Sequence, residues 1–223
     1  MANNKQIIFS AAERATLHKV LAARRDMRHF ISGASVSDDV MDRLFEAAHL
    51  APSVGLMQPW RFIRVQNDQL REDIALLVDE EISNTANEIG SRKNDFLKLK
   101  LEGIRTCAQI VAVVLAPDDG TLLGRRTLPF EMALCSAACA IENMWLTARA
   151  ENIGLGWVSL FDPQKLGALL HCPKEALPIA LLCIGPVHEF YEKPMLVQEG
   201  WRDEKPLAGM LFEDRWPVEG KAQ

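Results

Sequence analysis

The chain has 223 residues, which suits one large domain or two small ones with a sizeable hydrophobic core. Its 25 lysines and arginines stand against 30 aspartates and glutamates, so the formal net charge is −5. That balance excludes a nucleic-acid binder that relies on overall positive charge, but it allows a local basic pocket.

We expect no signal peptide and no membrane-spanning segment. The first residues lack a basic region followed by an apolar run, and the longest apolar runs, 109–117 and 177–186, are too short to cross a bilayer. The cysteines are odd in number and lie mostly in apolar segments: Cys107, Cys135, Cys139, Cys172 and Cys183. We therefore predict reduced, buried thiols in a cytoplasmic protein.

The elements follow one another without a repeat or a convincing domain boundary. Residues 11–23 predict a helix, and the segment RRDMRHF, 24–30, follows in extended form. Ser37 has the position of an N-cap for a second helix, which Pro52 ends. We then expect a strand at 60–65, a long polar helical region at 69–105 and a buried strand at 110–116. A buried apolar helix at 129–154, closed by Gly154, should follow. The remaining elements are a strand at 154–160, a short helix at 166–170 and a strand at 178–187.

The tail after Val187 has about 36 residues and contains two of the five tryptophans, Trp201 and Trp216. It is too apolar for a disordered linker, so we predict that it packs against another surface.

Several familiar site motifs are absent from the sequence. The pair Gly154 and Gly156 is followed by WVSL rather than by a third glycine that opens a helix, so the dinucleotide fingerprint fails. No Gly-Lys-Ser or Gly-Lys-Thr occurs, and Ser53 in APSVG lacks the first glycine of a hydrolase elbow. The adjacent pair His171 and Cys172 does not have the spacing of a metal site, and we expect no metal.

The segment RRDMRHF places three arginines around one carboxylate. In an extended chain Arg24, Asp26 and Arg28 share one face. Guanidinium groups bind phosphate through paired N–H donors, and a carboxylate between two of them should have a lowered pKa, which makes it a base and a poor acid. Taken alone, the segment is better explained as a solvated surface cluster paired within the chain.

Two later stretches favour a ligand site. APSVGLMQPW, 51–60, offers the donor and acceptor of Gln58 to the edge of a heterocycle, with apolar surface from Met57 and Trp60. In GLGWVS, 154–159, the glycines would let a ligand approach the backbone, and Ser159 adds a hydroxyl. A bulge with a buried serine explains the second stretch about as well.

Together, RRDMR, APSVGLMQPW and GLGWVS resemble, in order and spacing, the nitroreductase-like flavoprotein superfamily over residues 15–217. The resemblance implies one α+β domain, 1–223, with a mixed, mostly antiparallel sheet flanked by helices. It further implies an intertwined homodimer with FMN at the interface, in which each tail, 188–223, packs on the partner subunit.

Asp26 and Leu56 depart from the ordinary superfamily pattern, which has Ser or Thr and Asn at these positions. Asp26, the PSVGLMQPW form of the loop and the tail GWRDEKPLAGMLFEDRW resemble the 5,6-dimethylbenzimidazole synthase family instead. That resemblance implies that dioxygen and reduced FMN, supplied by a flavin reductase, give 5,6-dimethylbenzimidazole for cobalamin and erythrose 4-phosphate. An NAD(P)H-dependent nitroreductase or quinone reductase and a flavin-storage protein are the alternatives.

Carried over position by position, the resemblance makes Asp26 and Ser159 the catalytic candidates. Asp26 would act as the base, and Ser159 would orient the flavin or an intermediate. The implied FMN-binding residues are Arg24, Arg25, Asp26, Met27, Arg28, Ser53, Met57, Gln58, Lys100, Gly156, Val158, Ser159 and Arg215.

Overall fold

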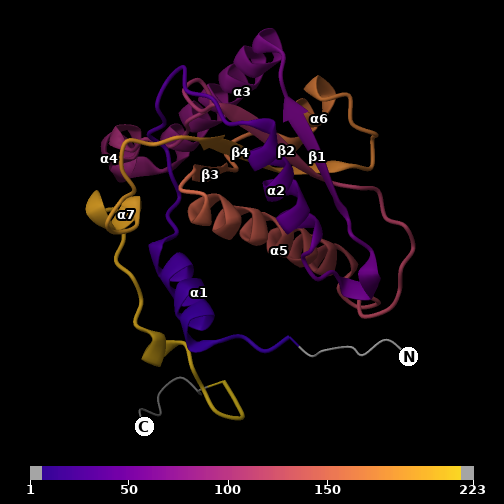
Figure 1. The fold of residues 1–223 in the computed structure, drawn as a ribbon. Coiled ribbons are helices and arrows are strands. Elements are labelled where there is room, and N and C mark those ends of the chain that lie inside the picture. Colours follow the sequence, from indigo (N-terminus) through magenta and orange to yellow (C-terminus); the bar gives the residue numbers. More distant parts are fainter. Residues whose placement is uncertain (1–6, 217–223) are drawn as a thin grey trace.

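A four-stranded antiparallel sheet forms the centre of the computed structural model, which describes residues 7–216 (Figure 1). The strands lie in the order β1 (Trp60–Val65), β2 (Gln109–Leu115), β4 (Leu177–Gly185) and β3 (Gly154–Val158). The predicted strand at 60–65 is confirmed, and the others agree to within a few residues. The α+β class of the prediction is confirmed as well.

Helices cover both faces of this sheet. On one face α2 (Asp38–His49) and α5 (Pro129–Ala150) pack against Val111 and Val113 of β2. On the other face α3 (Asp68–Glu88) and α6 (Pro163–Leu169) pack against Ile110 and Ala112. Because successive side chains of a strand point to opposite faces, a strand covered on both sides is apolar throughout. This explains the uninterrupted apolar run of β2.

Local signals set several helix limits. The Ser37 side chain accepts a hydrogen bond from the N–H of Val40 and caps α2, as predicted. The predicted end of the apolar helix at Gly154 is wrong: α5 ends at Ala150, and Asn152 takes the left-handed conformation (φ 57°) that turns the chain. Gly154 is instead the first residue of β3.

The polar helical region is shorter than the sequence predicts. α3 ends at Glu88, a 3-10 turn follows at Gly90–Arg92, and α4 (Lys93–Lys98) completes the region. Residues 99–108 are not helical and form the connection into β2. This connection takes part in the candidate site described below.

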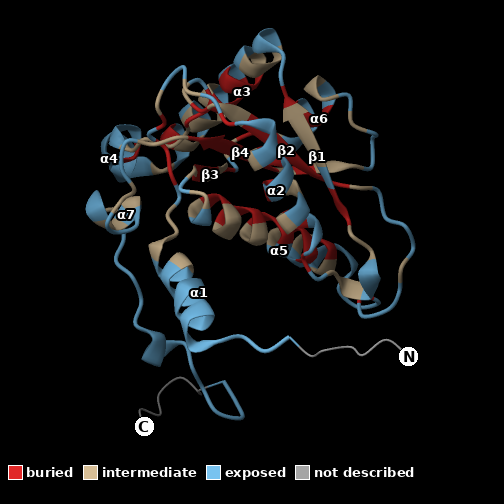
Figure 2. Ribbon diagram, viewed as in Figure 1, coloured by how far each residue is buried: buried red, intermediate tan, exposed pale blue. Residues whose placement is uncertain are grey.

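The prediction that the cysteines are buried is wrong for three of them. Cys107 and Cys183 are buried, but Cys135 and Cys139 are exposed and Cys172 is half-buried. Cys135 and Cys139 lie on the side of α5 that faces away from the sheet, which the described residues do not cover completely, and Cys172 lies in the turn after α6 (Figure 2). An apolar helix therefore has an uncovered surface in a single chain.

The two ends of the described chain project from the body (Figures 1 and 2). α1 (Ala11–Ala23) has no buried residue. The tail passes through the short α7 (Met195–Gln198), and Trp201 then packs on α4, with its ring 6.2 Å from that of Phe96. Beyond it, Leu207, Leu211 and Trp216 stay exposed. Within residues 7–216, no helix has the length and apolar character needed to cross a membrane.

Candidate functional site

The segment Arg24–Phe30 lies beside β3 at the edge of the sheet. Asp26 forms a parallel bridge with Leu155 of β3, and the N–H of Met27 donates to the carbonyl of Leu155 at 3.0 Å. The predicted extended form is confirmed. This single parallel bridge lies outside the pairings of the four strands, which are all antiparallel, so the sheet is antiparallel rather than mixed.

The carboxylate of Asp26 is held from two sides. Arg28 donates from Nη1 to Oδ1 and from Nη2 to Oδ2, each at 2.6 Å, in the bidentate geometry of a strong charge-assisted pair. The backbone N–H of Trp157 donates to Oδ1 at 2.9 Å. The Asp26 side chain stays 46% exposed, whereas that of Arg28 is only 8% exposed. The acid therefore has a fixed orientation and keeps an open side.

Arg28 has no N–H donor left for a ligand. Its five donors are used by the two oxygens of Asp26 and by three backbone carbonyls. The carbonyls are those of Leu101, Met27 and Trp157, at 3.0, 3.1 and 2.6 Å. In the arrangement described here, Arg28 is thus the partner of Asp26 and of the surrounding backbone rather than a free phosphate ligand.

The predicted lowering of the Asp26 pKa is wrong in direction. Desolvation by the densely packed surroundings raises the pKa of Asp26, and the paired Arg28, the N–H of Trp157 and the more distant Arg24 offset only part of that rise. Solvent still reaches nearly half of the side chain, so the rise is limited. A carboxylate with a raised pKa is a better proton acceptor than one with a lowered pKa.

Gly156 is needed by the chain itself. A side-chain carbon at this position would overlap the carbonyl oxygen of Met27 and Nη1 of Arg28. The space that we expected to admit a ligand is therefore filled by the Asp26 segment. The glycine lets that segment lie against β3, and the close approach brings the carboxylate to Trp157.

Arg24 and Arg25 point to different neighbours. Arg24 lies over the ring of Trp145 at 4.7 Å and has only a 3.5 Å ion pair with Glu142. Arg25 donates to the carbonyls of Ala22, Arg24 and Glu192. Its Nε is buried without a hydrogen-bond partner among the described residues. The donors left over at this edge therefore belong to Arg24 and Arg25.

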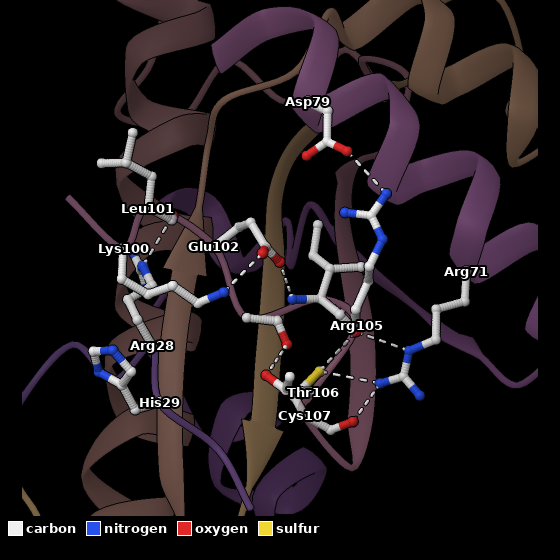
Figure 3. A network of polar contacts seen from close by, with 12 residues as sticks. Arg28, His29, Arg71, Asp79, Lys100, Leu101, Glu102, Arg105, Thr106 and Cys107 are labelled. Atoms are coloured by element: carbon white, nitrogen blue, oxygen red, sulfur yellow. Dashed lines mark hydrogen bonds and ion pairs between the residues drawn. The ribbon is translucent and has the colours of Figure 1, made fainter. Parts of the chain in front are cut away.

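The connection before β2, residues 99–108, contacts the side chain of Arg28 (Figure 3). The Leu101 carbonyl accepts from Arg28 Nε, and the neighbouring Lys100 pairs with Glu102 at 3.0 Å. Glu102 in turn accepts from the N–H of Ile104, which fixes the bend of the connection. Lys100, which the resemblance implies as an FMN-binding residue, thus lies next to the backbone group that holds Arg28.

Three predicted residues of the β3 region differ in their exposure. Ser159 follows the end of β3 and is exposed, so it is not the buried serine of the alternative explanation. Met27 and Val158 are buried in the core on the α3 side of the sheet. Both residues are buried as a whole, so neither offers a surface to a ligand in the described chain.

The loop that carries Ser53, Met57 and Gln58 has an unusual backbone. Leu56 and Gln58 adopt positive φ angles of 55° and 43°, which side chains other than glycine rarely tolerate. The hydroxyl of Ser53 accepts from the N–H of Gln58 at 3.1 Å and closes the loop. Such strain is typical of functional loops that neighbouring structure holds in place.

This loop lies far from Asp26 within one chain. The N–H of Val54 is bound by Ser136 near the start of α5, and the carbonyl of Arg25 is bound by Trp145 near its end. At 1.5 Å per residue, these two anchors are roughly 14 Å apart along the helix. The exposed tail that carries Arg215 leaves the body beyond α1 (Figure 1). The predicted residues thus form separate groups in a single chain.

A cavity of about 750 Å³ lies between the 116–133 region and α6. Its lining is mostly apolar and includes Leu115, Phe130 and Leu177, with Asp118 and Arg125 among the polar groups. Of the predicted site residues only Met57 lines it. The polar cluster at Asp26 and this cavity are therefore different places. Among the described residues, no cluster of His, Cys, Asp and Glu could hold a metal ion.

Sequence reasoning missed the groups that orient Asp26 and Arg28. Leu101 contributes only a carbonyl, which no side-chain pattern can signal. Trp157 lies within GLGWVS and could have been singled out, although its backbone does the binding. Tyr191, the only tyrosine in the sequence, accepts from the N–H of Arg28 and lies 2.6 Å from Nδ1 of His29.

The residues fit an anionic, flat cofactor such as FMN. The buried Nε of Arg25 without a partner and the weakly paired guanidinium of Arg24 provide donors for an anion. Ser159 is exposed and follows Trp157 by two residues, and the N–H of Trp157 holds Asp26. The donor set therefore agrees with the cofactor that the sequence resemblance implies.

The sequence of the chain is similar to those of known proteins. The model of the nitroreductase family matches residues 21–186. A 5,6-dimethylbenzimidazole synthase of Rhodospirillum rubrum is 37% identical, with 89% of this chain and 95% of the relative covered. One from Rhodobacter capsulatus is 36% identical, with 89% and 96% covered.

Solved structures share the fold. Iodotyrosine deiodinase bound to FMN and 3-iodo-L-tyrosine superposes with a TM-score of 0.70 at 16% identity, over 90% of this chain and all of that one. The NADPH:FMN oxidoreductase of Vibrio harveyi gives a TM-score of 0.69 at 13% identity, over 91% and 78% of the two chains.

Proposed function

The chain belongs to the nitroreductase family, and we propose that it is the oxidoreductase of that family that fragments reduced FMN with dioxygen. The products are 5,6-dimethylbenzimidazole, the lower ligand of cobalamin, and erythrose 4-phosphate. The similarity to named 5,6-dimethylbenzimidazole synthases over nearly their whole length supports the reaction. The observation that carries it in the structure is the carboxylate of Asp26, which is fixed by Arg28 and Trp157 and open on one side.

In this proposal Asp26 accepts a proton from the ribityl carbon next to the flavin ring. Its bidentate pair with Arg28 and its bond to Trp157 hold the carboxylate in one orientation, which lowers the cost of positioning in the transition state. The packed surroundings raise its pKa, and this favours proton uptake. Ser159, two residues after Trp157, orients the flavin with its hydroxyl.

Arg24, Arg25 and Lys100 would hold the phosphate and ribityl oxygens. Arg24 and the buried Nε of Arg25 have the donors for this task, and Lys100 lies half-exposed in the connection that supports Arg28. Arg28 contributes indirectly, by holding Asp26. When bound, reduced FMN supplies the electrons for dioxygen and is itself the molecule that is cleaved.

We further propose that the site is completed by a second copy of the chain. Asp26 and the Ser53–Gln58 loop are anchored roughly 14 Å apart along α5, so the loop of the partner is better placed to meet the flavin held at Asp26. The uncovered α1, the exposed side of α5 and the apolar tail from 188 onward provide the surface for such a homodimer. The exposed Arg215 would reach the partner's flavin.

A single-turnover experiment tests the reaction. The protein is loaded with FMN, reduced without oxygen and then exposed to dioxygen, and the products are measured by mass spectrometry. We expect 5,6-dimethylbenzimidazole and a matching loss of flavin. Full recovery of oxidised FMN contradicts the proposal. Rapid bleaching of the flavin by NADPH without oxygen would support a nitroreductase instead, since the proposed enzyme receives reduced flavin from a separate reductase.

A further inference from the structure

Arg125 fastens the connection between β2 and α5. Its side chain is 4% exposed, and all five N–H donors are used. Nη1 and Nη2 donate to the two oxygens of Asp118 at 2.6 and 2.9 Å. The remaining donors reach the carbonyls of Thr121 at 3.2 Å and of Pro129 at 2.9 and 3.2 Å. One buried guanidinium thus joins the beginning, the middle and the end of this connection, which we term the Arg125 clip (residues 118–129).

The clip packs directly against the loop that carries Ser53, Met57 and Gln58. A side-chain carbon at Gly55 would lie 2.6 Å from Cγ2 of Thr121 and 3.1 Å from the carbonyl of Leu123. One at Gly124 would lie 2.7 Å from Cγ2 of Val54. The two segments therefore touch with no room for a methyl group on either side.

The loop needs an external support of this kind. Gly55, Leu56 and Gln58 all have positive φ angles, and two of the three are not glycine. Inside the loop, the N–H groups of Leu56 and Met57 donate to the carbonyls of Ser53 and Val54. The Ser53 hydroxyl accepts from the N–H of Gln58, and Ser136 of α5 accepts from the N–H of Val54. The exposed side chain of Leu56 contributes little to its packing. The Arg125 clip packs against the loop at Val54 and Gly55.

We infer that Arg125 is a positioning residue for the flavin-contacting loop. This inference rests on the proposed function. Arg125 touches neither Ser53 nor Gln58, and it acts through Thr121, Leu123 and Gly124. Without its guanidinium the Asp118 carboxylate keeps the N–H of Gly120 but loses its bidentate partner, and the Thr121 and Pro129 carbonyls lose the donors of Arg125, so the clip opens. The strained loop then relaxes, and its residues no longer meet the edge of the flavin ring.

The test compares Arg125→Met and Arg125→Lys with Arg43→Met as the matched control. Arg43 makes a similar bidentate pair, with Glu151 at 2.7 and 3.0 Å, but it joins α2 to the end of α5, away from the loop. The first readout uses flavin-free protein: backbone amide resonances of residues 53–58 should shift in Arg125→Met and stay unchanged in Arg43→Met.

The second readout is functional. For Arg125→Met we expect FMN affinity to fall roughly tenfold, and the benzimidazole formed per bound flavin to fall by roughly tenfold to a hundredfold, because small misplacements of positioning groups have effects of this size. Arg125→Lys keeps one charge and should restore part of the yield. A purely structural role would lower the melting temperature without changing the yield per bound flavin.

The inference is overturned if Arg125→Met leaves the 53–58 resonances and the yield per bound flavin as in the unmodified protein. If Arg125→Met does not fold, Asp118→Asn replaces it, since that change removes the paired charge at nearly constant size. Failure of the proposed function has a different signature: the unmodified protein then forms no benzimidazole, while the amide shifts still report whether the clip holds the loop.

Discussion

Two buried arginines in this molecule hold half-exposed aspartates in almost the same way, yet their surroundings act on the acids in opposite directions. Arg28 binds both oxygens of Asp26 at 2.6 Å, and Arg125 binds both oxygens of Asp118 at 2.6 and 2.9 Å. The pKa of Asp26 is raised by desolvation, whereas that of Asp118 is lowered by its hydrogen bonds to Arg125 and to the N–H of Gly120.

The difference lies in what surrounds each carboxylate. Asp26 is on a chain segment pressed against β3, where Gly156 permits close contact. Asp118 is in an open connection, and its side chain is 58% exposed. The same ion pair thus serves the proposed proton acceptor in one place and fastens a loop in the other. Packing density, rather than the identity of the pair, separates the two roles.

The largest stability effect is expected from removing the buried cation at Asp26. Arg28→Met leaves the Asp26 carboxylate with the N–H of Trp157 but without its charged partner, and it removes the donors that reach the carbonyls of Leu101 and Trp157. We expect a loss of about 3 kcal/mol in the free energy of unfolding. Urea denaturation measures it. The exposed pair offers the control: Arg43→Met should cost less than about 1 kcal/mol. Equal losses in the two variants would mean that Arg28 has no special structural role.

The second largest loss of stability is expected from a substitution at the contact between the segment of Asp26 and β3. Gly156→Ala places a carbon into the Met27 carbonyl and Arg28, so we expect a loss of roughly 1–3 kcal/mol and a weaker hold on Asp26. Gly167→Ala is the matched control, because its nearest neighbour would be at 3.7 Å and the position is helical. If Gly156→Ala is as stable as Gly167→Ala, the close contact is not needed.

In the loop that carries Ser53, Met57 and Gln58, we expect one substitution to increase stability. Leu56 is exposed and has a φ of 55°, so Leu56→Gly removes backbone strain and should raise the free energy of unfolding by up to about 1 kcal/mol. Leu50 is also exposed but has a φ of −73°, and Leu50→Gly should lower it. A loss in both variants would show that the loop is not strained.

The smallest effect, and the sharpest test of the comparison, is the titration of the two acids. Carboxyl carbon resonances should give Asp26 a pKa above 3.8 and Asp118 a pKa below 3.8. The signs fix the pH dependence of stability. The contribution that the pKa shift of Asp26 makes to the free energy of unfolding is present at low pH and is lost as pH rises through its pKa in the folded protein. That of Asp118 is present at neutral pH and is lost as pH falls through its folded pKa. If the pKa values of both acids shift in the same direction, the contrast between the two surroundings is wrong.

Local sequence signals predicted much of the fold. The strand at 60–65, the N-cap at Ser37 that starts α2, and the apolar run at 110–116 of a buried strand were all read from the sequence. These features depend on residues close together in the sequence, and periodicity reports them directly. The extended form of RRDMRHF was predicted in the same way.

The properties of the site depend on distant parts of the chain. Arg28 gives its donors to carbonyls 73 and 129 positions away, so its sequence neighbours could not show that it is saturated. The raised pKa of Asp26 follows from the same packing. Cys135 and Cys139 lie on an apolar helix whose outer side the described chain leaves open, and a sequence pattern cannot tell such a side from a buried one.

The carboxylate of Asp26 is central to the proposed reaction, and Asp26→Asn tests it most directly. The amide keeps the size of the side chain and one acceptor for Arg28 and Trp157, but it cannot take up a proton. The measurement is the amount of 5,6-dimethylbenzimidazole formed per bound flavin after reduced, FMN-loaded protein is exposed to dioxygen. The proposal predicts that FMN stays bound and that no product forms; product at the level of the unmodified protein would contradict it.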